Sequence, residues 1–245
     1  MIKLENVSKA FGANQVLRDV SLEVAQGTSL AIIGGSGTGK SVTLKCILGL
    51  ITPDSGAITL DGRPIEEDRP AFLRRFGMLF QGGALFDSMH VWQNVAFRLL
   101  QEGTEKEAAR DIAVAKLQRV GLKPHTADLY PAELSGGMQK RVALARAIAT
   151  EPEVIFFDEP TSGLDPIMSG VINRLIREIV TEMGSTTITI THDMSSVRVI
   201  ADTVALIHDG LVRWNGPVNQ MERADSPYLQ QFLNGLAEGP IEAVR

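Results

Sequence analysis

Hydrophobic and polar residues alternate along two stretches near the start of the chain, residues 2–7 and 15–24. Alternation with a period of two is typical of strands that are buried on one face. Asp-Gly pairs at 61–62 and 209–210 stand between such runs, and this pair favours a tight turn between antiparallel strands. The pattern therefore predicts a mostly antiparallel β layer in the first 65 residues, with a glycine-rich loop inside it.

Continuous apolar runs predict a second, mostly parallel core sheet. The runs are SLAIIG (29–34), FGMLFQ (76–81), EVIFFDE (153–159) and TTITITHD (186–193). Each has its polar residue at the carboxyl end, and open α/β sheets bind their ligands beyond that edge. We therefore expect an α/β fold whose functional side chains gather at one edge of the sheet.

Helical spacing interrupts this strand pattern. Residues 105–122 are rich in Ala, Glu, Lys and Arg, and they predict a helix within an inserted helical subdomain of about 88–150. A further helix is expected over 164–183. The predicted organisation is one domain over residues 1–225, followed by an appended tail over 226–245.

Composition restricts the possible settings. The net charge of −5 gives no electrostatic reason to expect nucleic acid as a partner. A single cysteine, Cys46, excludes an internal disulfide and fits a reducing compartment. No apolar stretch approaches the roughly 20 residues of a membrane-spanning helix, and no signal peptide is expected, so a membrane role requires a partner.

The segment GGSGTGKS matches the phosphate-binding pattern G-x-x-x-x-G-K-[ST] between a strand and a helix. Its candidate ATP-binding residues are Gly34, Gly35, Ser36, Gly37, Thr38, Gly39, Lys40 and Ser41. Backbone N–H groups and the helix N-terminus attract phosphate. Lys40 supplies a mobile cation for the β- and γ-phosphates, and Ser41 offers a hydroxyl ligand to Mg²⁺. The strand-loop-helix context argues against a glycine-rich turn without a ligand.

Two adjacent carboxylates, Asp158 and Glu159, end the run VIFFDE. Side chains alternate along a strand, so neighbouring acids at its tip point in different directions. We assign Asp158 to Mg²⁺ and Glu159 to the attacking water as general base. A solvated acidic edge is the alternative, which the buried run and the phosphate loop disfavour.

Three further residues are candidates at the same edge. Gln81 has an amide that can reach both Mg²⁺ and the water, and His192 can touch the γ-phosphate. A lone histidine is more often structural, but its position at the end of a strand favours function. Phe11 either stacks on the nucleotide base or is a core aromatic.

A second candidate phosphate site, Ser135, Gly136 and Gly137, opens a predicted helix over 135–149. The helix has an apolar stripe at Met138, Val142, Ala145 and Ile148. One nucleotide has one triphosphate, so two sites in one chain raise the question of what the second one binds. Two copies about a two-fold axis could each lend the second site to the other's ATP, with a self-complementary interface.

The ordered set GGSGTGKS, Gln81, LSGGM, VIFFDEP, SGLDP and His192 resembles the ATP-binding cassette (ABC) ATPases, over about residues 2–225. The resemblance implies the P-loop NTPase fold, ATP hydrolysis and a homodimer that sandwiches two ATP molecules. It implies that Ser135 and Gly137 act across the interface and that Asp165 couples the two sites. It also implies that the helical subdomain and the Gln81 region dock onto integral membrane permease subunits.

Met138 stands where the family usually has glutamine, so a polar contact near the nucleotide is expected to be lost or moved to Gln139. LSGGM, residues 79–97 and residues 232–241 resemble the ATPases of Mla/Mce-type lipid transporters. That resemblance implies transport of phospholipid or other lipids between the bacterial inner and outer membranes, a Mce-type lipid-binding subunit and a place on the cytoplasmic face of the inner membrane. The alternatives are an amino-acid or ion transporter, and a soluble ABC protein of translation or DNA repair.

The segment after Gln81 is unusually rich in apolar side chains. These are Phe86, Met89, Val91, Trp92, Val95 and Phe97. Each either belongs to the core of the subdomain or lines an exposed groove that receives a short helix of a membrane partner.

Overall fold

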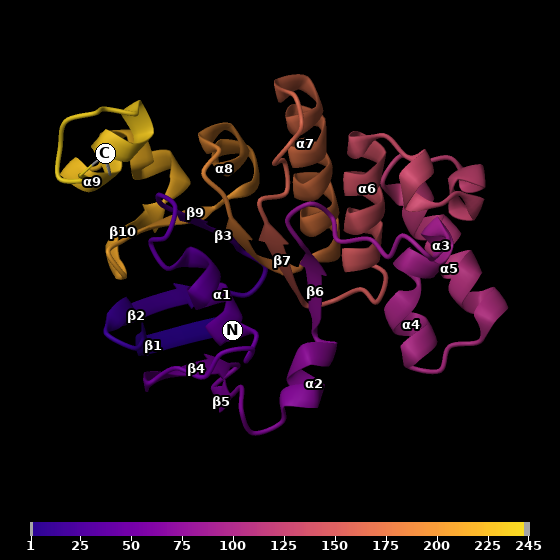
Figure 1. Ribbon diagram of the computed structural model, residues 1–245, viewed down its shortest axis with the longest axis horizontal. Coiled ribbons are helices and arrows are strands. Elements are labelled where there is room, and N and C mark those ends of the chain that lie inside the picture. The colour runs from indigo at the N-terminus through magenta and orange to yellow at the C-terminus, as the bar shows by residue number, and fades with distance from the viewer. Residues whose placement is uncertain (1, 243–245) are drawn as a thin grey trace. The chain divides into compact units, whose positions relative to one another are not determined.

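The computed structural model describes residues 2–242 (Figure 1). The chain forms two compact units. Unit 1 comprises Met1–Arg74 and Ile188–Arg245, and unit 2 comprises Arg75–Thr187. The predicted division into residues 1–225 and a tail over 226–245 stays a prediction, and its two outer ends, residue 1 and residues 243–245, lie outside the described part.

The antiparallel layer of unit 1 is formed by β1 (Ile2–Phe11), β2 (Asn14–Val24), β4 (Ser55–Leu60) and β5 (Arg63–Pro64), in the order β2-β1-β4-β5. Ile2 and Leu4 face the core while Lys3 and Glu5 are exposed, as the alternation predicts. The Asp-Gly pair at 61–62 makes the predicted turn between β4 and β5, with φ of 52° and 76°. These positive values fit a type I′ hairpin turn.

Unit 1 also holds three strands of the core sheet, namely β3 (Ser29–Ile33), β9 (Thr203–His208) and β10 (Leu211–Pro217). β3 is buried along its whole length and pairs in parallel with β9, while β10 pairs antiparallel with β9 through the Asp-Gly turn at 209–210. The helices of this unit are α1 (Lys40–Ile47), α2 (Arg69–Arg74), α8 (Met194–Ile200) and α9 (Pro227–Asn234), with the 3₁₀ helix η3 (Val218–Arg223).

Unit 2 contains the parallel pair β6 (Phe76–Leu79) and β7 (Val154–Asp158), with Phe76 beside Val154. Its helices are α3 (Val91–Val95), α4 (Phe97–Gln101), α5 (Lys106–Arg119), α6 (Gly136–Ala147) and α7 (Pro166–Met183), with the 3₁₀ helices η1 (Pro124–Asp128) and η2 (Pro131–Glu133). The parallel core strands, the antiparallel N-terminal layer and the helices confirm the predicted fold class.

The last core strand, β8 (Thr186–Ile190), starts in unit 2 and ends in unit 1. In unit 2 the Thr186 amide donates to the carbonyl oxygen of Glu153. In unit 1 the Thr191 amide donates to the carbonyl oxygen of Ile32, just before the glycine-rich loop. The chain beyond β8 therefore leaves the sheet next to the chain beyond β3.

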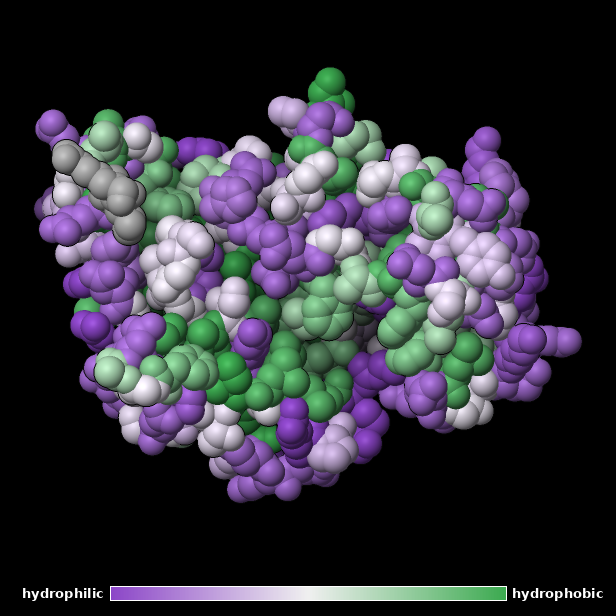
Figure 2. Space-filling view, in the orientation of Figure 1, coloured by the Kyte–Doolittle hydropathy of each residue, from purple (hydrophilic) through white to green (hydrophobic). Residues whose placement is uncertain are grey.

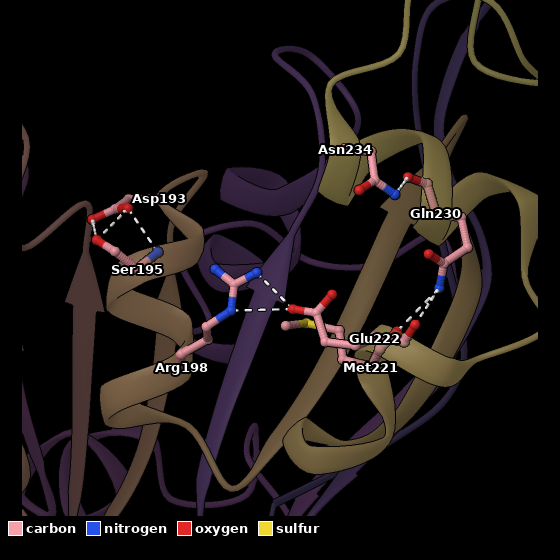
Figure 3. Close-up of polar contacts among 7 residues, drawn as sticks. All are labelled: Asp193, Ser195, Arg198, Met221, Glu222, Gln230 and Asn234. Carbon is pink, nitrogen blue, oxygen red and sulfur yellow. Dashed lines mark hydrogen bonds and ion pairs between the residues drawn. The ribbon is translucent and has the colours of Figure 1, made fainter.

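The segment that follows η3 packs on unit 1 instead of extending from it. Leu229 is fully buried in a cluster that includes Ile33 of β3 and Val197 of α8. Figure 3 shows two polar links here: Arg198 pairs with Glu222 at 2.6 Å, and the Gln230 amide donates to the carbonyl oxygen of Met221. Helix α9 is thus part of the core that supports β3.

The strand and helix ends differ from the sequence expectations by a few residues. β6 ends at Leu79, β7 at Asp158 and β8 at Ile190, so Gln81, Glu159 and His192 lie in the connections that follow the strands. Among residues 2–242, no helix is both long enough and apolar enough to cross a membrane.

Candidate functional site

The glycine-rich loop of unit 1 is closed by contacts that leave no room for side chains at two positions. Gly34 has a φ of 149°, and a Cβ there would overlap the carbonyl oxygen of Ile207. Gly39 has a φ of 106°, and a Cβ there would lie 2.7 Å from Leu17 Cδ2 and 2.9 Å from the carbonyl oxygen of Val16. The loop conformation therefore depends on glycine at these positions.

Lys40 begins α1, and its side chain folds back over the loop. The Lys40 Nζ donates to the carbonyl oxygens of Gly34 at 2.8 Å and Gly35 at 2.5 Å. Ser41 is exposed in the first turn of the same helix. The N–H groups of a first helical turn lack partners within the helix, so this end of α1 attracts an anion.

Phe11 ends β1 and is 49% exposed, which excludes the alternative of a core aromatic. The ammonium of Lys9 lies 5.7 Å from the centre of its ring. An exposed ring of this kind is free to offer a face to a planar partner.

His192 is exposed in the connection after β8, directly before a firmly capped helix. Asp193 caps α8 by accepting from the Ser195 amide at 2.9 Å and from the Ser196 hydroxyl at 2.6 Å (Figure 3 shows Asp193 and Ser195). Burial acts to raise the pKa of Asp193, but these hydrogen bonds outweigh it and hold the pKa below its ordinary value. The cap fixes the backbone next to His192.

Asp158 and Glu159 of unit 2 differ in backbone conformation, because the strand ends between them. Asp158 is the last residue of β7, and Glu159 leaves the strand with a φ of 47°. Pro160 follows and has no N–H with which to continue the ladder. The expectation that both acids sit on the strand is therefore wrong for Glu159, although the two side chains do leave from different backbone conformations.

Gln81 is exposed two residues beyond the end of β6, and the segment after it is held by an arginine of α6. Arg146 donates to the carbonyl oxygens of Gly83 at 2.7 Å and Ala84 at 2.8 Å. Burial lowers the pKa of Arg146, yet a guanidinium keeps its charge in proteins. Arg146 therefore fixes the loop that carries Gln81.

The second candidate phosphate site lies at the start of α6 and is held by side chains. The Ser135 hydroxyl caps the helix by accepting from the Met138 amide at 3.4 Å. The Gln139 amide donates to the carbonyl oxygens of Pro131 at 2.9 Å and Leu134 at 3.4 Å. Gln139 thus secures the chain that leads into the helix.

Asp165 is exposed and caps α7, where it accepts from the amides of Ile167 at 2.9 Å and Met168 at 3.0 Å. Ile167 is 80% exposed, which is unusual for an apolar side chain in the first turn of a helix. This end of α7 presents both an acid and an apolar group to the surroundings.

The apolar residues after Gln81 divide between core and surface. Val91, Trp92 and Val95 are buried, whereas Phe86 is 42% exposed and packs against Phe97 in a tilted arrangement with 4.7 Å between the ring centres. Met89 is partly exposed. Figure 2 shows hydrophobic surface over the region of α4, a helix in which no residue is fully buried.

The predicted site residues are therefore distributed over both units. Unit 1 holds Phe11, residues 34–41 and His192, and there the loop and His192 follow neighbouring strands. Unit 2 holds Gln81, residues 135–137, Asp158, Glu159 and Asp165, and there Asp158 ends β7 while Gln81 follows β6, the strand paired with β7.

Comparison with known proteins decides the family. The model of the ABC transporter family matches residues 17–162. The chain belongs to the ABC transporter family. It is an ABC-type ATPase, the ATP-binding subunit of a transporter, which confirms the resemblance carried by the motifs.

Similar proteins cover nearly the whole chain. The intermembrane phospholipid transport system ATP-binding protein MlaF of Escherichia coli (strain K12) is 41% identical over 98% of this chain and 91% of its own length. The probable ribonucleotide transport ATP-binding protein mkl of Mycobacterium leprae (strain TN) is 39% identical over 98% of this chain and 70% of its own length.

The solved structures include a dimeric post-hydrolysis state of the ATP-binding cassette MJ0796 bound to ADP and Pi. It is 30% identical, with a TM-score of 0.80, and the match covers 89% of this chain and 99% of that chain. The fold described above is thus the fold of an ATP-binding cassette.

Proposed function

We propose that the chain is the ATP-hydrolysing motor of a transporter that moves phospholipid between the bacterial inner and outer membranes. The observation that carries this proposal is the match to MlaF over almost the full length of both proteins. At 98% of this chain, the match also includes the predicted helical subdomain of about 88–150.

The site residues have complementary roles in this proposal. Lys40 leaves the carbonyl oxygens of Gly34 and Gly35 and binds the β- and γ-phosphates, while the amides of residues 34–39 hold the phosphate chain. Phe11 stacks on the base. Glu159 accepts the proton of the water that attacks the γ-phosphorus, and His192 donates to the γ-phosphate while the bond from that phosphorus to the bridging oxygen breaks and ADP leaves.

The residue types fit Mg²⁺ as the metal. The Ser41 hydroxyl, the Gln81 amide oxygen and the Asp158 carboxylate are hard oxygen ligands of the kind that Mg²⁺ prefers, and it commonly takes its remaining ligands from substrate phosphates. When bound, Mg²⁺ neutralises charge on the transferred phosphate.

We infer that the second phosphate site serves the ATP of a partner copy in a homodimer. Gly136 meets no atom of its own chain within 4 Å of an added Cβ, so nothing in the described chain explains a glycine there. The dimeric state of the similar cassette MJ0796 supports the arrangement. Ser135, Gly136 and Gly137 then grip the partner's γ-phosphate, and Asp165 couples the two sites.

The exposed aromatic side chains of unit 2 suit a membrane partner. Phe86 presents apolar surface close in sequence to Gln81, so a short helix of an integral membrane permease would sense the state of the Gln81 loop. In the lipid-transport setting the complex also includes a Mce-type lipid-binding subunit. The ATPase then lies on the cytoplasmic face of the inner membrane.

Purification of the native complex through a tag on this chain tests the proposal. We expect integral membrane subunits to co-elute and mass spectrometry to find phospholipid bound to them. A complex that carries amino acids or ions, or a chain that elutes without membrane subunits, would contradict it. Bound ribonucleotide beyond the ATP site would favour the function named for mkl.

A further inference from the structure

Lys140 is a buried lysine on α6, the helix that begins at the second candidate phosphate site, residues 135–137, which we call the signature. It lies in α6, five residues after Ser135, and only 5% of it is exposed. A buried ammonium is costly unless nearby groups compensate its charge. The compensating groups are therefore informative about what the lysine does.

Those groups belong to the catalytic acids. The Lys140 Nζ donates to the main-chain carbonyl oxygen of Glu159 at 3.4 Å. Burial lowers the pKa of Lys140, and the carboxylates of Glu159 and Asp158 oppose that effect. The ammonium thus lies within the field of both candidate catalytic acids of its own chain.

The backbone at Glu159 needs such support. Its φ of 47° is uncommon for a residue other than glycine, and a conformation of this kind costs about 1–3 kcal/mol. The following residue, Pro160, further favours an extended conformation at Glu159. The Glu159 carbonyl oxygen also accepts from the Ser162 amide at 3.1 Å, so two donors from different segments hold this peptide in place.

We propose that Lys140 is a positioning residue that ties the signature helix to the backbone of Glu159, so that the signature of a chain helps to orient the catalytic carboxylate of the same chain. The inference rests on the proposed function, in which Glu159 is the general base and the signature binds the partner's ATP. Lys140 lies five positions beyond Ser135, a rise of about 7.5 Å along a rigid helix. A shift of α6 on binding the partner's ATP therefore moves the donor that holds Glu159.

The consequence is a direct route between the two ATP sites of the dimer. Nucleotide bound at the signature of one chain belongs to the partner's site, whereas Glu159 acts on the chain's own nucleotide. Lys140 links the signature helix to Glu159, and all three lie in unit 2. This link does not involve the glycine-rich loop of unit 1.

Lys116 offers a matched control. It is also buried, at 8% exposed, and it lies in the same unit. Its Nζ pairs with Glu151 at 2.8 Å and not with the candidate catalytic acids. Lys116→Met and Lys140→Met remove the same atoms and the same charge from comparable burial. A purely structural lysine at position 140 would give the same result as Lys116→Met.

The test measures kcat and KM for ATP, together with the thermal midpoint, for the full chain in its native complex. We expect Lys140→Met to lower kcat by about tenfold to a hundredfold, the range for a lost hydrogen bond from a charged group, with KM within about twofold of wild type. Lys140→Gln, which keeps a donor but not the charge, should recover part of kcat. Lys116→Met should lower the midpoint without lowering kcat.

A kcat of Lys140→Met within about twofold of wild type, or a kcat no lower than that of Lys116→Met, would overturn the inference. Should Lys140→Met fail to fold, Lys140→Ala, which also removes the donor and places a good helix former in α6, carries the test: a lowered kcat with unchanged KM supports the inference, and an unchanged kcat overturns it. Glu159→Gln separates the two proposals. Hydrolysis by Glu159→Gln refutes the general base, whereas an inactive Glu159→Gln beside a fully active Lys140→Met refutes only the role of Lys140.

Discussion

The two phosphate sites of this chain are built in different ways. The loop over 34–41 is closed by its own chain, because a Cβ at Gly34 or Gly39 would meet the backbone of a neighbouring strand. At the signature, a Cβ on Gly136 would meet nothing within 4 Å, and a Cβ on Gly137 would meet only the mobile end of Met168 at 2.8 Å. The glycines of the first candidate site are therefore required by their own chain, whereas Gly136 of the second has no such requirement.

The largest expected effect concerns the closed site. Lys40→Ala removes the ammonium that would bind the β- and γ-phosphates, so we expect ATP turnover to fall by more than about a hundredfold. Turnover at saturating ATP and binding of a fluorescent ATP analogue check this. Normal hydrolysis by Lys40→Ala would remove the first site from the account.

Alanine at two glycines tests the comparison itself. Gly39→Ala should destabilise the nucleotide-free protein by about 1–3 kcal/mol, since a residue with a Cβ is strained at a φ of 106°. Gly136→Ala should leave the nucleotide-free stability within about 0.5 kcal/mol of wild type, because alanine is favourable in a helix and meets no neighbour. It should nevertheless lower ATPase activity strongly.

Chemical denaturation of both variants without nucleotide, followed by ATPase assays, provides the measurement. If Gly136→Ala were as destabilising as Gly39→Ala, the signature glycine would have a role in its own chain. If it were fully active, the signature would not be occupied by nucleotide.

A smaller effect is expected from Phe11, the residue proposed to stack on the base of ATP. Phe11→Ala should raise KM for ATP by a factor that corresponds to about 1–3 kcal/mol, the value of one base–aromatic stack, with kcat little changed. Phe11→Trp should retain stacking and serve as the control. An unchanged KM in Phe11→Ala would show that the exposed ring has another partner.

The smallest effect concerns the support of the signature. Gln139→Leu removes the amide that holds Pro131 and Leu134, so we expect a loss of about 1 kcal/mol in stability and a partial loss of ATPase activity. Met138→Gln, which restores the residue usual in the family, should be nearly neutral. A large gain of activity in Met138→Gln would show that Gln139 does not replace the usual contact.

Most of the fold, and the place of the candidate site residues at the strand ends, could be predicted from the sequence, because the motifs are local. A strand, a glycine-rich loop and a helix in succession define the first phosphate site, and the Asp-Gly pairs define their turns. The roles of Lys140 and Arg146 could not be predicted, since their partners, Glu159 and Gly83, are distant in the sequence. The packing of α9 could not be predicted either, because the buried cluster that Leu229 shares with Ile33 and Val197 joins residues that are distant in the sequence. The sequence alone therefore predicts an appended tail for the residues of α9.

The central claim is that ATP joins two copies of this chain, each lending its signature to the other. The most direct test is the mass in solution of Glu159→Gln, by light scattering or sedimentation, with and without ATP. We expect Glu159→Gln to form a stable dimer only with ATP. Adding Gly136→Ala to the same chain should weaken that dimer. An ATP-bound Glu159→Gln that stays monomeric, beside a wild-type chain that hydrolyses ATP fully as a monomer, would contradict it.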